Sequence, residues 1–300
     1  MVIPVLLGVT LITFLLSSFS AGDAAHILAE KLYNHPTLEQ IELVRHEAGL
    51  DLPLHEQYAT WLARVATGDF GNSLYTDKPA LHMLISHITP TFKLGITGLF
   101  LLVGISFPLA LFSVVYENRL FDKLVKVFSY LSVSIPSFWL GLLFLYIFGV
   151  QLGIISVIGG DTKGIPFIAA FVLAFRYFGV LIRLIRANLI EILNLDFIRA
   201  CRAKGLSTVR ILFVHGLKNA LIPVVTRSSS IAVHLIIGSA IIETIFSIKG
   251  IGFLALQAML TKDMPVLQCY IIVVSCLVIF VNLAIDISYT MLDKRIKLTE

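Results

Sequence analysis

Apolar residues in this chain of 300 residues come in long, nearly unbroken blocks rather than in short alternating runs. A helix needs about 20 consecutive apolar residues to cross the hydrocarbon core of a bilayer. The blocks therefore predict six transmembrane helices, at residues 2–20, 92–115, 127–150, 165–182, 221–243 and 269–290. We expect an all-α membrane protein whose single transmembrane domain occupies residues 1–300. A signal peptide in place of the first helix is less favoured, because no basic residue precedes that block.

The segment between the first two blocks, residues 21–91, is the longest polar stretch of the chain. Thr37 and Gln40 have the spacing of a capping box, which predicts the start of a helix, and Gly49 can end that helix. A second helix is predicted over residues 54–67, because its apolar positions keep the helical period. Both are expected to be amphipathic helices on the external side.

Composition and charge agree with a membrane protein. A hydrophobic fraction of 57%, a charged fraction of 14% and a mean hydropathy of +0.91 exclude an ordinary soluble domain. With the N-terminus inside, the cytoplasmic loops (116–126, 183–220, 291–300) hold 13 Lys or Arg in 59 residues, and the external segments (21–91, 151–164, 244–268) hold 7 in 110. This bias predicts a multi-pass protein of the cell (inner or plasma) membrane with both termini in the cytoplasm. It also accounts for the net charge of +4, so no nucleic-acid partner is expected.

The sequence carries no pattern typical of an enzyme or of a resident cofactor. Cys201, Cys269 and Cys276 are isolated from one another, which predicts neither a disulfide framework nor a zinc site. No GxxxxGK[ST] phosphate-binding loop occurs, so a partner would have to bind any ATP. Six of the eight histidines fall in the external segment, where neutral imidazole would suit nickel, but dispersed histidines do not define a metal site.

The cytoplasmic segment 183–220 has more structure than a basic linker requires. Phe197, Ile198 and Cys201 form a short apolar ridge, and Gly205 can then end the helix in a left-handed turn. A second helix is predicted from Ser207, which can cap it, up to the start of the next span at Pro223. Its apolar stripe comprises Val209, Leu212, Phe213, Leu217 and Ala220. The basic residues alone could serve as anchors that touch anionic lipid headgroups, but the stripe favours burial against a partner protein.

Resemblance to a known family begins in this loop, with the stretches RACRAKG (199–205) and KNALIP (218–223). They are similar to the EAA loop of the permease subunits of ABC importers, most closely in the peptide and nickel branch. Two further stretches resemble the external segment and the last external loop of that branch. They are GLDLPLHEQYATWLARVATGDFGNSL (49–74) and ETIFSIKGIGFLALQAMLTKDMPVLQ (243–268). The resemblance covers nearly the whole chain, and its motifs occur in the expected order.

The family carries its coupling helix in this loop, where it contacts the ATP-hydrolysing subunit. The residues that the resemblance implies for coupling are Arg199, Ala200, Cys201, Gly205, Val209, Leu212, Phe213, Asn219 and Pro223. Gly205 would be the hinge, and Arg199 stands where the general motif has an acidic residue. The implied partners are a second homologous permease subunit, two ABC ATPase subunits that bind ATP and Mg²⁺, an extracytoplasmic solute-binding protein and the lipid bilayer.

Ionisable residues within predicted spans are candidates for the translocation pathway, because charge is costly in lipid. Arg176 and His234 are the two that we assign to the pathway. Lys93, Glu243 and Asp286 lie near predicted span ends, where we expect them to reach the interface by snorkelling.

The function expected is that of a permease subunit of an ATP-driven importer rather than of an enzyme. The stretch DMPVLQCY (263–270) resembles nickel and metal-chelate permeases, and dipeptides or oligopeptides are the alternative substrates. An ion-driven secondary transporter would require an inverted repeat and paired acidic residues at mid-membrane. An intramembrane hydrolase would require a nucleophile and base, or a metal pair, within the spans. The sequence contains neither pattern.

Overall fold

The computed structural model describes residues 2–20, 24–33, 35–154, 165–206, 208–211, 217–237 and 239–292. Throughout these ranges the regular structure is helical, and the single β-type pairing among them is an isolated bridge between Asn72 and Pro79. The chain divides into two compact units. Unit 1 comprises residues 1–89 and 253–280, and unit 2 comprises residues 90–252 and 281–300.

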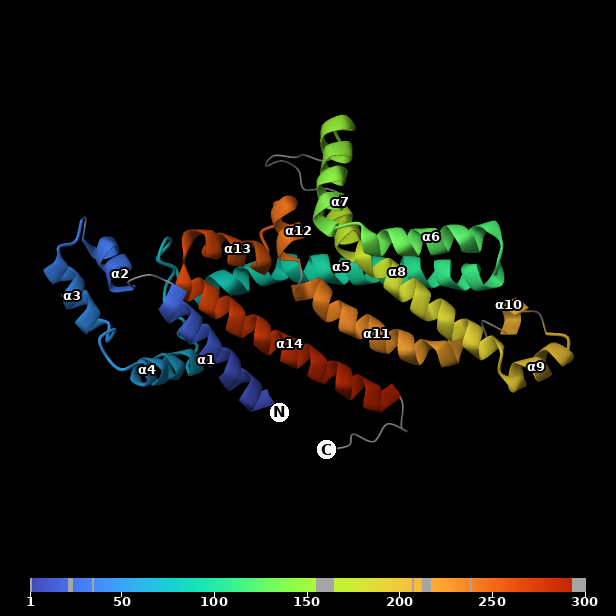
Figure 1. Cartoon of the computed structure of the whole chain (residues 1–300), viewed down its shortest axis with the longest axis horizontal. Helices are drawn as coiled ribbons and strands as arrows, with labels where there is room; N and C mark the ends of the chain where they lie inside the picture. The colour runs from blue at the N-terminus through green and yellow to red at the C-terminus, as the bar shows by residue number, and fades with distance from the viewer. Residues whose placement is uncertain are drawn as a thin grey trace. The chain divides into compact units, whose positions relative to one another are not determined.

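Unit 1 contains the first apolar helix and the predicted external segment (Figure 1). Its elements are α1 (Val2–Ser20), α2 (Ala24–Leu32), α3 (Leu38–Glu47), α4 (Leu54–Ala66), the start of α5 (Ala80–Val115), and most of α13 (Ile251–Thr261) and α14 (Met264–Leu292). The capping box of α3 is confirmed, because the Gln40 amide donates to Thr37 Oγ1 at 3.3 Å and the Thr37 amide donates to Gln40 Oε1 at 2.9 Å. Gly49 follows α3 with a φ of +66°, as its predicted role at the helix end requires.

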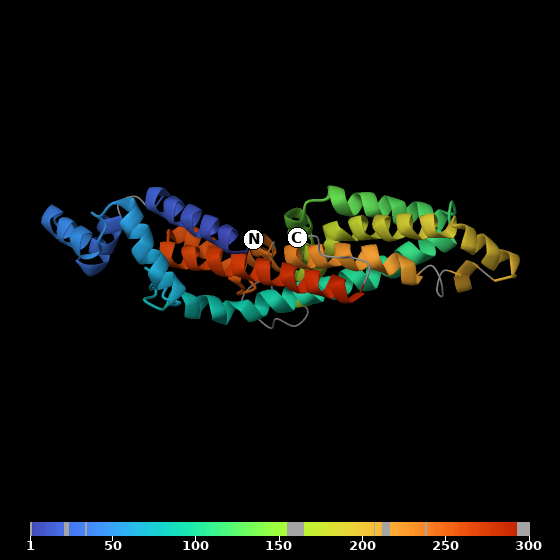
Figure 2. The ribbon, with the colours of Figure 1, turned by 90° about the horizontal axis from the view of Figure 1, so that it is seen from below.

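Unit 2 is a bundle in which α8 is the central helix. Its elements are the rest of α5, α6 (Leu120–Ser134), α7 (Ser137–Phe144), the π-helical turn η1 (Leu145–Gln151), α8 (Ile165–Leu193), α9 (Asp196–Ala203), α10 (Thr208–Ile211), α11 (Leu217–Ile237), α12 (Ala240–Ile245) and the end of α14. Figures 1 and 2 show α8 between α6 and α11 in two perpendicular views, and α8 packs against both. A helix so placed must be apolar on most sides, which explains why α8 contributes many of the buried core residues.

Four of the described helices, α1, α5, α8 and α14, are long and apolar enough to cross a membrane. A fifth candidate is the pair formed by α6 and the segment Ser137–Gln151, which is bent by 102° at its break. This differs from the single helix predicted for residues 127–150. Ile135 and Pro136 both have extended backbone conformations, because a proline disfavours helical geometry in the residue before it.

The boundaries of the other spans also differ from those predicted. α5 begins at Ala80 rather than at residue 92, and α8 continues to Leu193 rather than ending at residue 182. Hydropathy marks only the apolar part of a helix, whereas the helix itself can continue where its ends meet protein or water. The fifth predicted span is divided between α11 and α12, and of α11 only Arg227–Ile237 is strongly apolar. The number of six spans therefore stays a prediction.

One glycine sets the distance between α6 and α8. An ideal Cβ on Gly179 would lie 2.0 Å from the Ser129 carbonyl oxygen and 2.4 Å from Ser132 Oγ. The Gly179 amide donates a hydrogen bond to Ser132 Oγ at 2.9 Å. Small residues allow such close approach of helices in membrane proteins, where packing and interhelical hydrogen bonds replace the hydrophobic effect.

Candidate coupling segment and translocation face

The predicted coupling loop contains two described helices joined through a glycine. After α9, Gly205 has a φ of +78°, which is the left-handed conformation predicted for it. The Leu206 amide donates to the Cys201 carbonyl oxygen at 3.3 Å, which closes the helix end as in a Schellman motif. A Cβ on Gly205 would meet no atom within 4 Å. Backbone conformation rather than lack of space therefore favours glycine at this position.

Two isoleucines, one on each side of this glycine, anchor the segment in the core of unit 2. Ile198 of α9 and Ile211 of α10 are both 0% exposed, and both belong to the core cluster that contains the buried side chains of α8. Cys201 and Leu206 pack against the same cluster. Because protein cores are close-packed and barely compressible, a push on this segment must also displace its neighbours in the core.

The structure describes only part of the predicted coupling set. Leu212 and Phe213 lie outside the described residues, and so do the side chains of Arg199, Val209, Asn219 and Pro223. Ala200 is exposed on α9. Pro223 lies within α11, which begins at Leu217, so the prediction that the span starts at this proline is wrong. The predicted stripe also omitted Ile211, because three consecutive apolar residues at 211–213 leave the rotation of a short helix undetermined.

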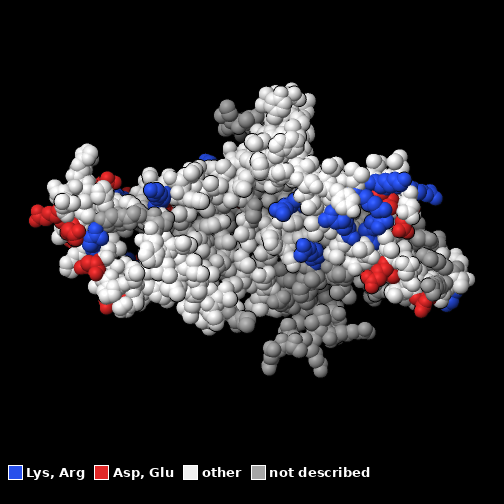
Figure 3. Space-filling model, viewed as in Figure 1, with Lys and Arg blue, Asp and Glu red and all other residues white. Residues whose placement is uncertain are grey.

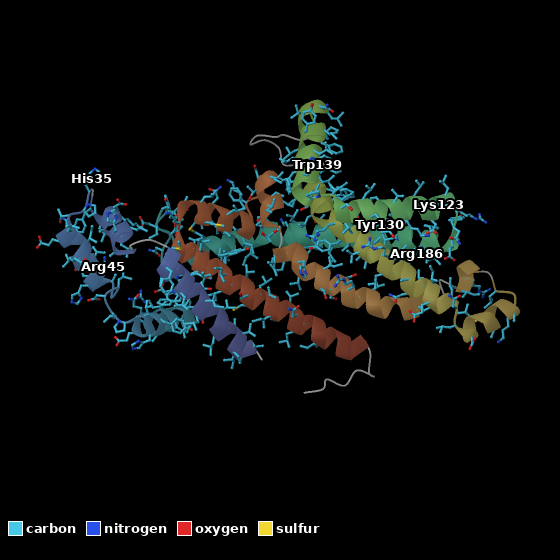
Figure 4. The ribbon with its side chains drawn as sticks, viewed as in Figure 1. His35, Arg45, Lys123, Tyr130, Trp139 and Arg186 are labelled. Atoms are coloured by element: carbon cyan, nitrogen blue, oxygen red, sulfur yellow. The ribbon has the colours of Figure 1, made fainter. Side chains whose placement is uncertain are left out.

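A buried carboxylate on α6, paired with a residue near the end of α8, was not predicted. Asp122 of α6 is fully buried and accepts from Arg186 of α8, with Nε 3.0 Å from Oδ1 and Nη2 3.2 Å from Oδ2. Lys126 Nζ lies 2.8 Å from Oδ2, and Ser113 Oγ of α5 donates to Oδ1 at 2.5 Å. Arg186 lies on the side of α8 that meets α6 (Figure 4). The network joins three helices about two turns before the end of α8.

A second buried carboxylate organises the other end of α11. Glu243 of α12 is fully buried and accepts hydrogen bonds on Oε1 from Thr91 of α5 at 2.7 Å and from Ser239 at 2.5 Å. Thr91 Oγ1 accepts in turn from the Ile251 amide at 2.9 Å. A Cβ on Gly250 would lie 2.3 Å from Thr91 Oγ1, so this turn requires a glycine. The prediction that Glu243 snorkels to the interface is therefore wrong.

The two predicted pathway residues are both exposed, on different helices of unit 2. Arg176 lies on α8, with its guanidinium carbon 5.5 Å from the centroid of the Tyr177 ring. His234 lies on α11, with Nδ1 2.8 Å from the Ser230 carbonyl oxygen. Because a carbonyl oxygen only accepts hydrogen bonds, Nδ1 carries a proton in this contact. Within the described residues no hydrogen bond or ion pair joins Arg176 to His234.

The predicted external segment is held to α14 and the turn before it by polar contacts within unit 1. Ser73 Oγ donates to Asp263 Oδ2 at 2.5 Å, and the Leu74 amide donates to Oδ1 at 3.2 Å. Trp61 Nε1 of α4 donates to Gln268 Oε1 of α14 at 3.1 Å. These contacts join two sequence motifs whose contacting residues are separated by 190 and 207 positions in the chain.

Unit 1 also contains a cavity of about 690 Å³. Its wall is formed by α1, α2, the end of α3, the connection between α3 and α4, α4, residues 69–74 and the start of α14. Arg45, Arg64 and Asp69 are its charged members. Arg45 and His35 lie in this predicted external segment (Figure 4). Among the residues that the structure describes, no three His, Cys, Asp or Glu side chains are grouped as a metal site would require.

A helical bundle with several apolar spans and a glycine-hinged segment between two of its helices is typical of membrane transport components. Family comparison agrees: residues 82–298 match the family described as binding-protein-dependent transport system inner membrane component, and residues 1–93 match its N-terminal companion family. The chain belongs to this family of permeases of ABC importers, and it is a multi-pass inner-membrane protein that works in transport.

Among its relatives are the glutathione transport system permease protein GsiC of Salmonella paratyphi A (strain ATCC 9150 / SARB42) and that of Escherichia coli (strain K12). Each is 32% identical over 295 residues, which is 98% of this chain and 95% of the relative. The fold is similar to that of a solved structure of the MetNI methionine ABC transporter in an inward-facing conformation. The TM-score is 0.58 at 18% identity, over 70% of this chain and 96% of the solved chain.

Proposed function

We propose that this chain forms half of the translocation pathway of an ATP-driven importer of short peptides. A second homologous permease subunit would complete the pathway, two ABC ATPase subunits would bind ATP and Mg²⁺, and a solute-binding protein would dock on the external segment. The observation that carries the peptide assignment is the 32% identity, over 98% of the chain, to permeases named for the transport of glutathione, which is itself a short peptide.

Nickel, which the stretch 263–270 favours, is the less favoured substrate on structural grounds. Within that stretch the Asp263 carboxylate accepts hydrogen bonds from Ser73 and Leu74, and Cys269 is fully buried. Both residues are thus engaged in holding unit 1 together. Their roles in packing account for these two residues without a metal, which supports a peptide as the substrate over nickel.

The coupling role rests on the packing around Gly205. ATPase subunits that close on ATP would push the exposed side of α9, where Ala200 lies, while Ile198 and Ile211 remain fixed in the core. The push would then reach α8 and the helices packed against it, and bias the bundle between outward-open and inward-open states. Both termini would lie in the cytoplasm, as the distribution of basic residues predicts.

Two substitutions of Gly205 test this role at a single position. A β-branched residue is strongly disfavoured at positive φ, whereas asparagine adopts the left-handed conformation readily. We expect Gly205→Val to reduce substrate-stimulated ATP hydrolysis by the purified complex at least about tenfold, and Gly205→Asn to retain most of it, since a left-handed β-branched residue costs about 1–3 kcal/mol. Equal stimulation in both variants, at equal membrane levels, would contradict the coupling role.

Uptake by cells that lack this chain tests the substrate. Radiolabelled glutathione, a labelled dipeptide and labelled nickel are supplied in parallel, with and without the restored gene. The proposal predicts that restoration recovers uptake of a peptide and leaves nickel uptake unchanged. Recovery of nickel uptake alone would overturn the peptide assignment while leaving the importer class intact.

A further inference from the structure

Four basic side chains lie in two exposed stripes of unit 2. Arg176 and Arg183 are exposed on α8, and Arg227 and His234 are exposed on α11. Each pair is seven residues apart, which places its members on one face of their helix, about 10 Å apart along the axis. Figure 3 shows isolated basic side chains on an otherwise uncharged surface over these two helices.

Residues beside these stripes on both helices are buried in the core, so the stripes cannot rotate inward. Phe175 and Phe178 of α8 are buried, as are Ile231 and Leu235 of α11. The next residue of α11, Ile236, comes so close to α5 that a Cβ on Gly95 would lie 2.9 Å from its Cγ1. The exposure of the basic residues is therefore a consequence of the packing of the bundle.

The basic residues of α8 differ in what they contact. Arg186 pairs with Asp122, while Arg183 donates to the Ser129 carbonyl oxygen at 3.2 Å and lies 5.6 Å from the centroid of the Tyr130 ring. Arg176 has no carboxylate partner among the described residues, and neither has Arg227. These two guanidinium groups carry a charge that the described part of this chain does not neutralise.

The two unneutralised arginines lie on neighbouring helices. The Arg176 guanidinium carbon is 5.5 Å from the centroid of the Tyr177 ring on α8, and α11, which carries Arg227, packs against α8. Both arginines therefore contribute positive charge to the exposed surface over this helix pair. Arg176 is also well inside the apolar stretch Pro166–Leu193. A cation at such a depth is costly in lipid, so its surroundings in the assembled transporter must be polar or water-filled.

We propose that Arg176 and Arg227, together with Tyr177, form an anion-binding subsite that receives a carboxylate of the peptide substrate during translocation. Guanidinium groups bind carboxylates through two parallel hydrogen bonds, and a tyrosine hydroxyl can add a third. Such a patch attracts peptides with a free carboxylate and repels cations, including an uncomplexed divalent metal. This inference rests on the proposed function and adds the chemical class of substrate that the pathway selects.

The test compares two substrates that differ in one carboxylate, in liposomes that contain the complete transporter and its solute-binding protein. The substrates are glutathione and its monoethyl ester, in which the glycine carboxylate is blocked. Arg176→Gln and Arg227→Gln should each raise the KM for glutathione about tenfold or more and change the KM for the ester much less. Arg176→Lys should restore part of the preference, because the charge is kept.

Arg183→Gln is the matched control, because that arginine lies on the same face of α8 but is already bound to Ser129 and Tyr130. It should leave the ratio of the two KM values unchanged. If the wild type imports glutathione and the Arg176 and Arg227 variants show the same ratio of the two KM values as the wild type, the subsite is overturned and the peptide assignment stands. Failure of the wild-type transporter to import either peptide would overturn the peptide assignment, and the subsite with it.

Discussion

Arg186 and Asp122 are joined by two nearly parallel hydrogen bonds of 3.0 and 3.2 Å, between a guanidinium group that is mostly buried and a carboxylate that is fully buried. Burial of a charge is tolerated only when it is paired and hydrogen-bonded. The pair therefore restricts how α6 and α8 can be arranged. Its loss should lower the stability of the whole bundle.

Replacing Arg186 by Met should lower the free energy of unfolding by about 3 kcal/mol, because it leaves Asp122 buried without the guanidinium that bonds both its oxygens. Lys126→Met removes a more exposed partner, with a side chain that is 40% exposed, and should cost less. Thermal unfolding of the detergent-purified chain, followed by a thiol-reactive dye, measures both. Equal destabilisation by the two variants would show that the two-point geometry is unimportant.

Thr91→Val should destabilise unit 2 by about 1–3 kcal/mol, because the valine can neither donate to Glu243 nor accept from the Ile251 amide. Thr91→Ser keeps the hydroxyl and should stay close to the wild type. The same unfolding assay distinguishes them. If serine and valine behaved alike, the methyl group of Thr91 rather than its hydroxyl would be what the fold requires.

Gly179→Ala should separate α6 from α8, because the added Cβ would lie 2.0 Å from the Ser129 carbonyl oxygen. We expect a loss of about 2 kcal/mol or more, as for overpacking in other cores. Gly104→Ala is the matched control, since a Cβ there meets no atom within 4 Å and alanine favours the helix. The prediction fails if both variants unfold at the temperature of the wild type.

Asp263→Asn should loosen residues 69–79, because an amide oxygen cannot replace both acceptors used by Ser73 and Leu74. Protease added outside spheroplasts should then cut this stretch several times faster than in the wild type. Asp77→Asn is the control, because Asp77 is largely exposed and pairs only with Lys31 at the surface. Cleavage that occurs only in inverted vesicles would contradict an external location.

Orientation can be read from two cysteines introduced into a chain without its three native thiols. Asp77→Cys should react with a membrane-impermeant maleimide in intact spheroplasts, and Lys123→Cys should react only after permeabilisation. Both positions are exposed in the structure, so accessibility should depend on the side of the membrane alone. The opposite pattern would invert the predicted topology.

Periodicity and capping signals located the elements of the external segment well. The capping box at Thr37 and the helix that starts at Leu54 depend on neighbouring residues, so the sequence contains nearly all the information needed. The left-handed turn at Gly205 belongs to the same group, because the choice of glycine expresses a local backbone requirement.

Contacts between distant residues could not be predicted in this way. Asp122 lies within the predicted loop 116–126 and Glu243 was placed near a span end, yet both are fully buried by partners from other helices. The sharp bend at Ile135 and Pro136 was underestimated, because a proline permits either a kink or a complete break and the surrounding bundle decides between them.

The contact at Gly179 restricts how this subunit can move. The two helices are in close contact at Gly179, and two helical turns further along they are joined by an ion pair, so they cannot slide or twist relative to each other. α6 and α8 should therefore move as one rigid body through the transport cycle. Opening and closing must take place at helix–helix interfaces other than the one between these two helices.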